Sequence, residues 1–222
     1  MARLWPEDQR FADRREAGRR LAERLNRFAG RPDVVVLALP RGGVPVGYEV
    51  AQALGVPLDV MVVRKLGFPG NAEFAMGAIG SGGVRVLNEE IPPEHMPPAA
   101  VVEAITGAER RELERREEAY RGRRTPVPVA GRVVLLVDDG LATGTTMRAA
   151  VRAVRDLKAA LVVVAVPVGA AQAREALAGL ADEVICLRAP EPFTAVGLWY
   201  RDFPQTSDEE VVSLLTAASA GR

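Results

Sequence analysis

The chain has 222 residues, of which 48% are hydrophobic and 26% are charged, and its formal net charge is zero. These values suit a single folded domain with a substantial core, with or without an elaboration. The neutral charge balance argues against a dedicated nucleic-acid binder. No apolar run reaches the length of a membrane span, and residues 1–30 carry many Arg and Glu rather than a signal core. We therefore expect a cytoplasmic protein with no membrane partner.

The first part of the chain predicts a helix followed by a βαβ unit. Residues 8–29 have apolar positions spaced among Arg and Glu, a pattern typical of an amphipathic helix. The runs 33–39 and 57–63 are apolar and bounded by breakers, which indicates buried strands, and residues 44–54 between them predict a helix. Strand, helix and strand at this spacing predict a parallel sheet.

The middle of the chain predicts an elaboration of that sheet. Residues 64–73 contain Gly and Pro and are expected to form a loop, after which 74–79 and 83–87 predict a hairpin with a Gly-Ser-Gly turn. A Pro-rich linker then leads into a highly charged helix over 99–121, where opposite charges three and four residues apart stabilise the helix locally. We assign 88–125 as a helical insertion whose charged face is solvated.

Regular alternation of strands and helices returns after residue 130. The pattern predicts strands over 132–138, 161–167 and 183–188, with helices over 145–157 and 170–180. An irregular aromatic tail, 189–207, precedes a last helix over 208–218. The whole chain, 1–222, is therefore predicted to be one α/β domain with an open, mostly parallel sheet flanked by helices.

Three rare residue types bear on the chemistry. Cys186, the only cysteine, lies in the apolar run Val-Ile-Cys-Leu, so we expect a buried strand residue with no disulfide partner. His95, the only histidine, lies in a Pro-rich stretch and is expected at the surface rather than in catalysis. The chain has 27 Arg but only two Lys, Lys65 and Lys158, which makes either lysine more informative than usual.

The most informative segment is 133–146, which reads Val-Val-Leu-Leu-Val-Asp-Asp-Gly-Leu-Ala-Thr-Gly-Thr-Thr. An apolar strand ends on two carboxylates, Asp138 and Asp139, and a loop of small residues leads into a helix that begins at Thr145. Backbone N–H groups of such a loop and helix N-terminus can hold a phosphate. The carboxylates can accept hydrogen bonds from sugar hydroxyls or hold a hydrated Mg²⁺. Together they suggest a ribose 5-phosphate ligand.

Each half of this segment has a simpler explanation. Asp-Asp-Gly after a strand can be a turn, and Thr-Gly-Thr-Thr can be an ordinary helix cap. The complete run is more specific, and it closely resembles the phosphoribosyl-diphosphate motif of type I phosphoribosyltransferases. Thr145 stands where a Walker A loop has Lys, and the chain has no G-x-G-x-x-G, so neither a P-loop nor a dinucleotide site is expected.

The resemblance implies the type I phosphoribosyltransferase fold and a pentosyltransferase reaction, such as one of nucleotide salvage. A nitrogen base would displace diphosphate from Mg²⁺-bound phosphoribosyl diphosphate. Asp138 and Asp139 would hold the ribose hydroxyls and position the Mg²⁺, mainly through substrate and water. The 5′-phosphate would lie against the loop that follows, made of Ala142, Thr143, Gly144, Thr145 and Thr146.

A second loop, Pro40-Arg41-Gly42-Gly43, also follows a predicted strand, on the side of the sheet where ligands of open parallel sheets bind. Its simpler explanation is a turn into a helix. It resembles the family's diphosphate loop, in which Gly42 and Gly43 would let the backbone approach the anion and Arg41 would add positive charge. The resemblance also implies a cis peptide bond between Pro40 and Arg41.

The third loop, 64–73, resembles the start of the family's mobile catalytic loop. Arg64 and Lys65 would then close over the diphosphate, with Lys65 favoured because lysine is rare here. If they did not directly follow a predicted strand of the parallel sheet, both would be interpreted as ordinary surface cations.

The acceptor base is left open. Family members that use 6-oxopurines usually carry a carboxylate where this chain has Ala142, and the loop looks more like that of adenine-using members. A general acid or base must then come from elsewhere, with Glu73 and Asp202 as candidates. The tail, 189–207, is expected to be a small hood over the nucleophile's site, although its aromatic residues are more often core than a base platform.

The main alternative function is a non-catalytic regulatory protein that binds phosphoribosyl diphosphate, because some relatives of this fold are transcription regulators. The cations Arg41, Arg64 and Lys65 favour catalysis, and no helix-turn-helix is evident. A phosphoribosyl-diphosphate hydrolase or a pyrophosphorolytic salvage enzyme is a third alternative. The expected partners also include a second copy of the chain, as a possible homodimer.

Overall fold

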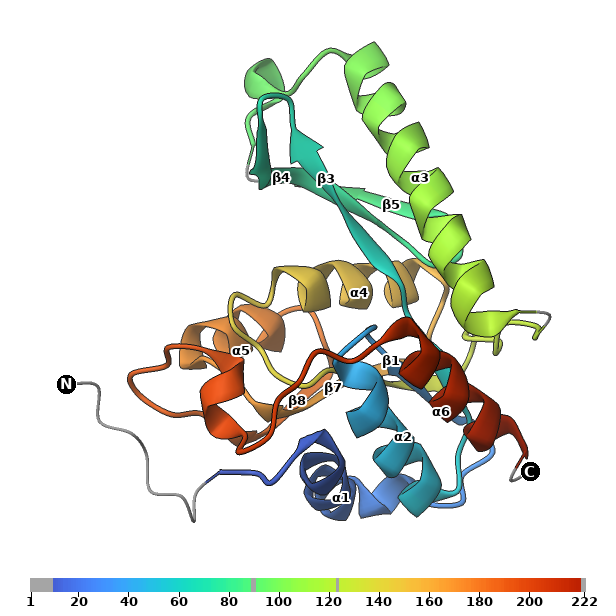
Figure 1. Cartoon of the computed structure of the whole chain (residues 1–222). Coiled ribbons are helices and arrows are strands. Elements are labelled where there is room, and N and C mark those ends of the chain that lie inside the picture. The colour runs from blue at the N-terminus through green and yellow to red at the C-terminus, as the bar shows by residue number, and fades with distance from the viewer. Residues whose placement is uncertain (1–9, 89–90, 123, 221–222) are drawn as a thin grey trace.

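A five-stranded parallel sheet forms the body of the molecule (Figure 1). The computed structural model describes residues 10–88, 91–122 and 124–220, without the side chains of Ala72 and Glu73. The strand order is β2-β1-β6-β7-β8, with bounds Leu58–Val60, Val34–Ala38, Val133–Val137, Leu161–Val168 and Glu183–Arg188. The two central strands, β1 and β6, are apolar and buried along their whole length. This confirms the predicted open parallel sheet.

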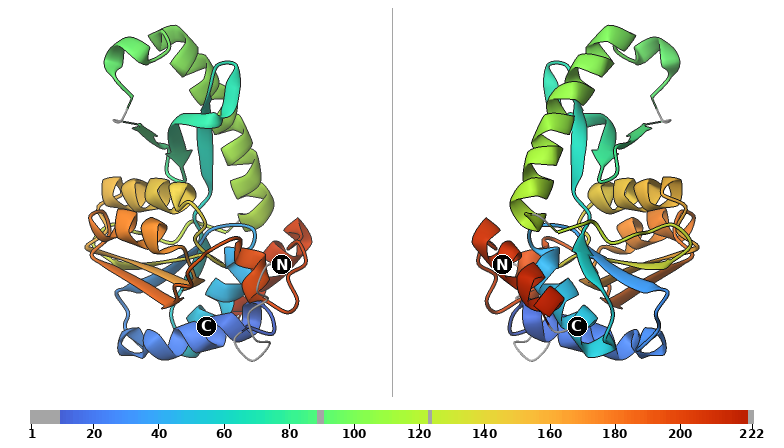
Figure 2. Two further views of the ribbon diagram at one scale, coloured as in Figure 1. Left: turned by 90° about the vertical axis from the view of Figure 1, so that its left-hand side faces the viewer. Right: turned by 90° about the vertical axis from the view of Figure 1, so that its right-hand side faces the viewer.

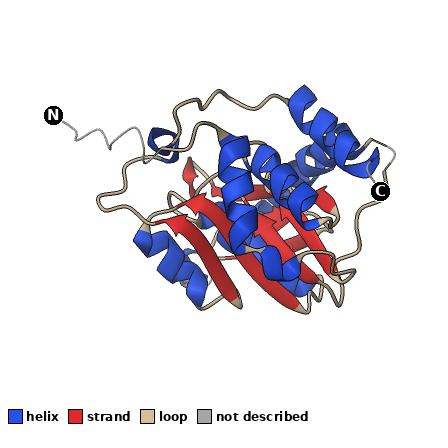
Figure 3. Ribbon diagram, turned by 90° about the horizontal axis from the view of Figure 1, so that it is seen from below, coloured by secondary structure: helices blue, strands red, loops and turns tan. Residues whose placement is uncertain are grey.

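Helices cover both faces of the sheet, which is why its central strands are apolar on both sides. Along β1, Val34 and Val36 pack into one core cluster with α1, α2 and α6, while Val35 and Leu37 pack into a second cluster with α4 and α5. Figure 3 looks onto the molecule from below, where helices lie across the strands. The helices span Arg14–Arg24 (α1), Gly43–Leu54 (α2), Thr145–Asp156 (α4), Ala171–Ala178 (α5) and Asp208–Ala220 (α6).

The first helix and the second strand are shorter than predicted. The α1 helix begins after Asp13, whose side chain caps the helix by accepting a hydrogen bond from the N–H of Glu16. A 3₁₀ turn over Asn26–Phe28 follows it, and residues 8 and 9 lie outside the described part of the chain. The β2 strand has only three residues because the chain leaves the parallel sheet before Val63 and enters a second one.

An arm projects from the body, as both views of Figure 2 show. It consists of an antiparallel sheet in the order β3-β4-β5, spanning Val63–Phe68, Asn71–Gly80 and Val84–Leu87, and of the long helix α3, Ala99–Arg121. The prediction of a loop over 64–73 is therefore wrong. Leu66 is fully buried, and only Pro69 and Gly70, with Gly70 at a φ of +78°, make the turn between β3 and β4.

The other expectations for the middle of the chain agree with the structure. The strand predicted at 74–79 lies within β4, the strand predicted at 83–87 is β5, which begins one residue later, and the predicted helix over 99–121 is α3. His95 is exposed on a short 3₁₀ helix, Pro93–His95. Cys186 lies in β8, half-buried, as a free thiol. Among the described residues, no helix combines the length and the apolar character needed to cross a membrane.

A buried ion pair fastens the arm to the parallel sheet. The Arg121 guanidinium, at the end of α3, donates from Nε to the Asp59 carboxylate at 2.9 Å and from one terminal nitrogen to the Val60 carbonyl at 2.8 Å. Asp59 also accepts hydrogen bonds from the N–H groups of Val60 and Val127. Because both side chains are at most 10% exposed, the Asp59 carboxylate depends on these partners for its solvation.

We predict that Arg121→Met destabilises the protein by about 3 kcal/mol, because it leaves a buried carboxylate without its counter-ion. Urea unfolding measures this change. The matched control is Arg115→Met, which removes an exposed arginine paired with Glu112 on the same helix and should change stability little. Equal destabilisation by the two substitutions would contradict the conclusion that the Arg121–Asp59 ion pair fastens the arm to the sheet.

Candidate functional site

The loops that follow β1 and β6 meet at one edge of the sheet. The two strands pair in register up to Ala38 and Val137, and the Leu39 N–H continues the pairing with the Val137 carbonyl at 2.9 Å. The chain therefore delivers residues 40–43 and 138–146 side by side. This is the arrangement that the sequence predicted.

Two glycines allow these loops to touch. A Cβ atom on Gly42 would lie 2.0 Å from the Asp139 carboxylate oxygen Oδ2, and one on Gly43 would lie 2.8 Å from the Val137 carbonyl oxygen and 2.9 Å from the Asp138 Cα. No side chain fits in either place. The glycines are thus required by the contact between the two loops, in addition to any role toward an anion.

The Pro40–Arg41 peptide bond is cis, as the resemblance implied. The α2 helix begins two residues later, at Gly43. The Arg41 guanidinium is about one-third exposed and lies 3.8 Å from the Asp208 carboxylate at the start of α6. In this structure, then, Arg41 contacts the C-terminal helix.

The two acids at the end of β6 have different surroundings. The Asp138 carboxylate accepts a hydrogen bond from the N–H of Asp139 at 2.8 Å, whereas Asp139 Oδ2 accepts one from Arg14 Nε at 2.8 Å. Burial raises the pKa of Asp138 well above its usual range, and the like charge of Asp139 adds to this. Burial also raises the pKa of Asp139, but Arg14 opposes the shift.

Arg14 is a site residue that the sequence analysis missed. It was counted with the charged face of the first helix, yet it is only 9% exposed. A signal was present in the sequence, because the buried residues of α1 are Arg14, Ala17, Gly18, Leu21 and Ala22, at the spacing of one helix face. An arginine on that apolar face indicates a buried partner.

The loop after the acids leads into a helix that begins at Thr145, as the sequence predicted. Gly144 adopts a φ of +72° immediately before α4, a conformation that favours glycine, and the α4 N-terminus follows at Thr145. Ala142, Thr143 and Thr145 are exposed, and the hydroxyls of Thr143 and Thr145 lie 3.2 Å apart. Exposed backbone at a helix N-terminus, with hydroxyl donors beside it, suits an oxyanion.

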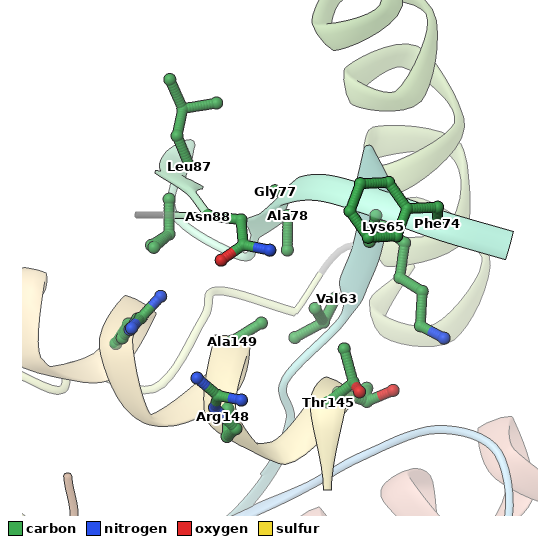
Figure 4. A pocket seen from close by; sticks show the side chains of 14 residues that line it. Val63, Lys65, Phe74, Gly77, Ala78, Leu87, Asn88, Thr145, Arg148 and Ala149 are labelled. Atoms are coloured by element: carbon green, nitrogen blue, oxygen red, sulfur yellow. The ribbon is translucent and has the colours of Figure 1, made fainter. Parts of the chain in front are cut away.

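The arm adds one of its two candidate cations to this region. Lys65 is exposed and lines a cavity of about 280 Å³ between the arm and α4, together with Thr145 and Thr146 (Figure 4). Arg148 of α4 also points into the cavity in that view. Arg64 instead pairs with Glu109 of α3 at 2.7 Å. Sequence reasoning missed Arg148, since a cation inside a helix gives no local signal of what it faces.

The tail reaches the same edge of the sheet from the opposite side. Tyr200 donates its hydroxyl to the Asp139 carbonyl at 2.6 Å and contacts the rings of Phe11 and Phe203. Trp199 and Tyr200 are each 3% exposed, so these two aromatics belong to the core, as favoured from the sequence. Of the two acid/base candidates, Asp202 is exposed, and the Glu73 side chain lies outside the described residues.

Asp138 and Asp139 supply oxygen donors of the kind that Mg²⁺ prefers. Among the described residues, no group of three or more Asp, Glu, His or Cys side chains could hold a metal ion. The donor set therefore fits a Mg²⁺ whose other ligands are substrate phosphates and water, and does not fit an all-protein cage.

Compared with the sequence models of known protein families, residues 11–198 of this chain match the model of the phosphoribosyl transferase domain. The chain belongs to the phosphoribosyl transferase family. Two Mycobacterium tuberculosis proteins whose names assign them to the phosphoribosyl transferases are each 51% identical over 208 residues, which cover 94% of this chain and 47% of theirs. The chain thus spans about half the length of these curated relatives.

Solved structures agree with this membership. The crystal structure of the TT1426 protein from Thermus thermophilus is 46% identical and superposes with a TM-score of 0.84, covering 94% of this chain and 98% of that one. The AQ2163 protein from Aquifex aeolicus shares the fold alone, with 12% identity and a TM-score of 0.51 over 92% of this chain and 85% of that one. The phosphoribosyl transferase fold that the 133–146 segment predicted is confirmed.

We predict that Gly42→Ala destabilises the domain by about 1–3 kcal/mol, because its methyl group would overlap the Asp139 carboxylate and force the two loops apart. Thermal unfolding measures the change. Gly179→Ala is the matched control, since Gly179 has right-handed helical torsions and no atom within 4 Å of its Cβ position. A Gly42→Ala protein as stable as the control would show that the loops can separate without cost.

Proposed function

We propose that this domain transfers ribose 5-phosphate from phosphoribosyl diphosphate to a nitrogen base. The bond from C1 to the diphosphate oxygen breaks, a bond from C1 to the nitrogen forms, and diphosphate leaves. The observation that carries this proposal is the contact of Gly42 and Gly43 with Asp138 and Asp139 beside the open N-terminus of α4. Backbone for a diphosphate, carboxylates for a sugar and a phosphate loop would then form one candidate site at this edge of the sheet.

Each part of this candidate site would have a role in binding. The amides of residues 143–146 would hold the 5′-phosphate, and the carboxylates of Asp138 and Asp139 would face the ribose. The backbone at Gly42 and Gly43 would hold the diphosphate. Bound Mg²⁺ would neutralise charge on the diphosphate, with Asp138 and Asp139 holding it mainly through substrate and water.

The transition state should have oxocarbenium character at C1, with negative charge growing on the diphosphate. The protein then acts through positioning and charge stabilisation. Lys65 is suited to this role because it is exposed and lines the cavity that Thr145 and Thr146 also line. Arg41 and Arg64 are the other candidates, and each would have to exchange a carboxylate partner, Asp208 or Glu109, for the diphosphate.

Those two ion pairs favour one alternative function. A regulatory protein that binds phosphoribosyl diphosphate without turnover can leave Arg41 and Arg64 paired with carboxylates, as they are in this structure. The place of Lys65 at the cavity favours the transferase function, because a protein that only binds the ligand has less need of a cation that the arm carries over it. Nucleotide salvage, a homodimer and a cytoplasmic location stay predictions.

We predict diphosphate release when the protein is incubated with phosphoribosyl diphosphate, Mg²⁺ and a panel of nitrogen bases, with the product identified by mass. Guanine and hypoxanthine should be poor acceptors, since Ala142 offers no ionisable side chain to a 6-oxopurine. The Asp138→Asn/Asp139→Asn double variant should lose most affinity for phosphoribosyl diphosphate in calorimetry, because it removes the negative charge that the acid pair presents to the sugar and the metal, and a single charge-assisted contact contributes about 1.5–3 kcal/mol. Undiminished affinity in the double variant would contradict the proposed site.

We predict that Lys65→Gln lowers kcat about tenfold or more while changing phosphoribosyl-diphosphate binding less, because Lys65 meets charge that grows as diphosphate leaves. The only other lysine is the control: Lys158 is exposed just after α4, and Lys158→Gln should retain normal kcat. Loss of affinity at unchanged kcat in Lys65→Gln would favour the regulatory alternative.

A further inference from the structure

Arg14 joins three segments that are distant in the sequence. Its Nε donates to the Asp139 carboxylate at 2.8 Å, and one terminal nitrogen donates to the Pro204 carbonyl at 2.7 Å. Its Cζ lies over the Phe203 ring, 3.7 Å from the ring centre. A side chain of α1 thus ties the tail to the end of β6.

The tail makes a second contact with the same acid. Tyr200 donates its hydroxyl to the Asp139 carbonyl, so Asp139 is held through its side chain by Arg14 and through its backbone by Tyr200. The Asp139 Oδ2 atom also lies against the Cα of Gly42, where a methyl group would overlap it. Asp139 is therefore enclosed by α1, the tail and the diphosphate loop.

Asp138 is placed differently. Its side chain contacts the backbone beside it: Oδ1 accepts a hydrogen bond from the Asp139 N–H and lies 3.0 Å from the position that a Gly43 Cβ would take. Neither Arg14 nor the tail forms a hydrogen bond with the Asp138 side chain in the described part of the structure. The two adjacent acids thus differ in what they are attached to.

We propose that the two acids divide their work, with Asp138 binding the sugar of the ligand directly and Asp139 linking segment 199–204 to the site through Arg14. Arg14 is then a positioning residue rather than a ligand contact. This inference rests on the proposed function for the sugar ligand. The link between Arg14, Asp139 and the tail stands apart from it.

The chemistry of Arg14 supports this division. The guanidinium offers separate donors along its two edges, and here they serve two acceptors on different segments while its Cζ lies over the Phe203 ring. A lysine carries its charge at one nitrogen and cannot reproduce this arrangement. An arginine that only balanced the charge of Asp139 would need neither the Pro204 carbonyl nor the ring.

The test compares amide substitutions at the two acids, because an amide oxygen can still accept from Arg14 but carries no charge for a sugar or metal. Calorimetry with phosphoribosyl diphosphate and Mg²⁺ should show at least a tenfold loss of affinity for Asp138→Asn and a smaller loss for Asp139→Asn. Asp139→Ala and Arg14→Met should each weaken binding, and their double variant should be no weaker than either single variant. When Arg14→Met is combined with Asp138→Asn, the fold loss of affinity should equal the product of the losses in the two single variants.

Hydrogen exchange of residues 199–204 without ligand gives the second readout. Arg14→Met and Asp139→Ala should speed exchange in this segment, Arg14→Lys should do so less, and Asp138→Asn should leave it unchanged. Arg15→Met is the control, since neighbouring Arg15 is exposed on the same helix and pairs with Glu49 of α2. If Arg14→Met proves unstable, Asp139→Ala and Arg14→Lys carry the comparison.

Equal loss of affinity in Asp138→Asn and Asp139→Asn would overturn the division of work, because it would make Asp139 a direct ligand contact. Unchanged exchange of 199–204 in Arg14→Met and Asp139→Ala would overturn the link to the tail. If the unaltered protein binds no phosphoribosyl diphosphate, the proposed function fails and the division of work fails with it, while the exchange experiment still decides the link.

Discussion

The site depends on how closely two backbones approach at the ends of β1 and β6. The strands are paired in register up to Ala38 and Val137, so the loops after them cannot avoid each other. Glycine at 42 and 43 removes the side chains that would collide with Asp139 and Asp138. This contact places the start of α2, at Gly43, against the two acids of the other loop. A ligand held by both loops is therefore held by the strand register itself.

Two buried Arg–Asp pairs attach the additions to this frame. Arg121 and Asp59 fasten the arm near β2, and Arg14 and Asp139 fasten the tail to β6. A buried pair of this kind contributes little net stability compared with apolar packing, but loss of one partner leaves a charge that water cannot reach. Such pairs specify position, because the carboxylate is satisfied only when the arginine arrives from one direction. The arm and the tail are thereby placed relative to the strand ends.

The features that sequence predicted well are those whose signal is local. The apolar run 133–137, the acids after it and the loop into Thr145 are contiguous, and they predicted the family and its fold. The apolar runs 33–39 and 57–63, with a helical pattern between them, are equally local and predicted the βαβ unit. Arg14 was misplaced because its partner Asp139 is 125 residues away, although its place on the apolar face of α1 was visible. The partners of Arg41 and Arg64 lie on α6 and α3, and no spacing in the sequence indicates those contacts.

The error over 64–73 has a chemical consequence. A flexible loop could turn Arg64 and Lys65 toward the same anion, but these residues lie in β3, where successive side chains point to opposite faces. Arg64 therefore meets Glu109 of α3, while Lys65 faces the cavity beside α4. The same alternation places Leu66 on the face of β3 that carries Arg64, and Leu66 is fully buried there. The arm thus presents one cation toward the phosphate loop, and α3 contributes by holding the other away from it.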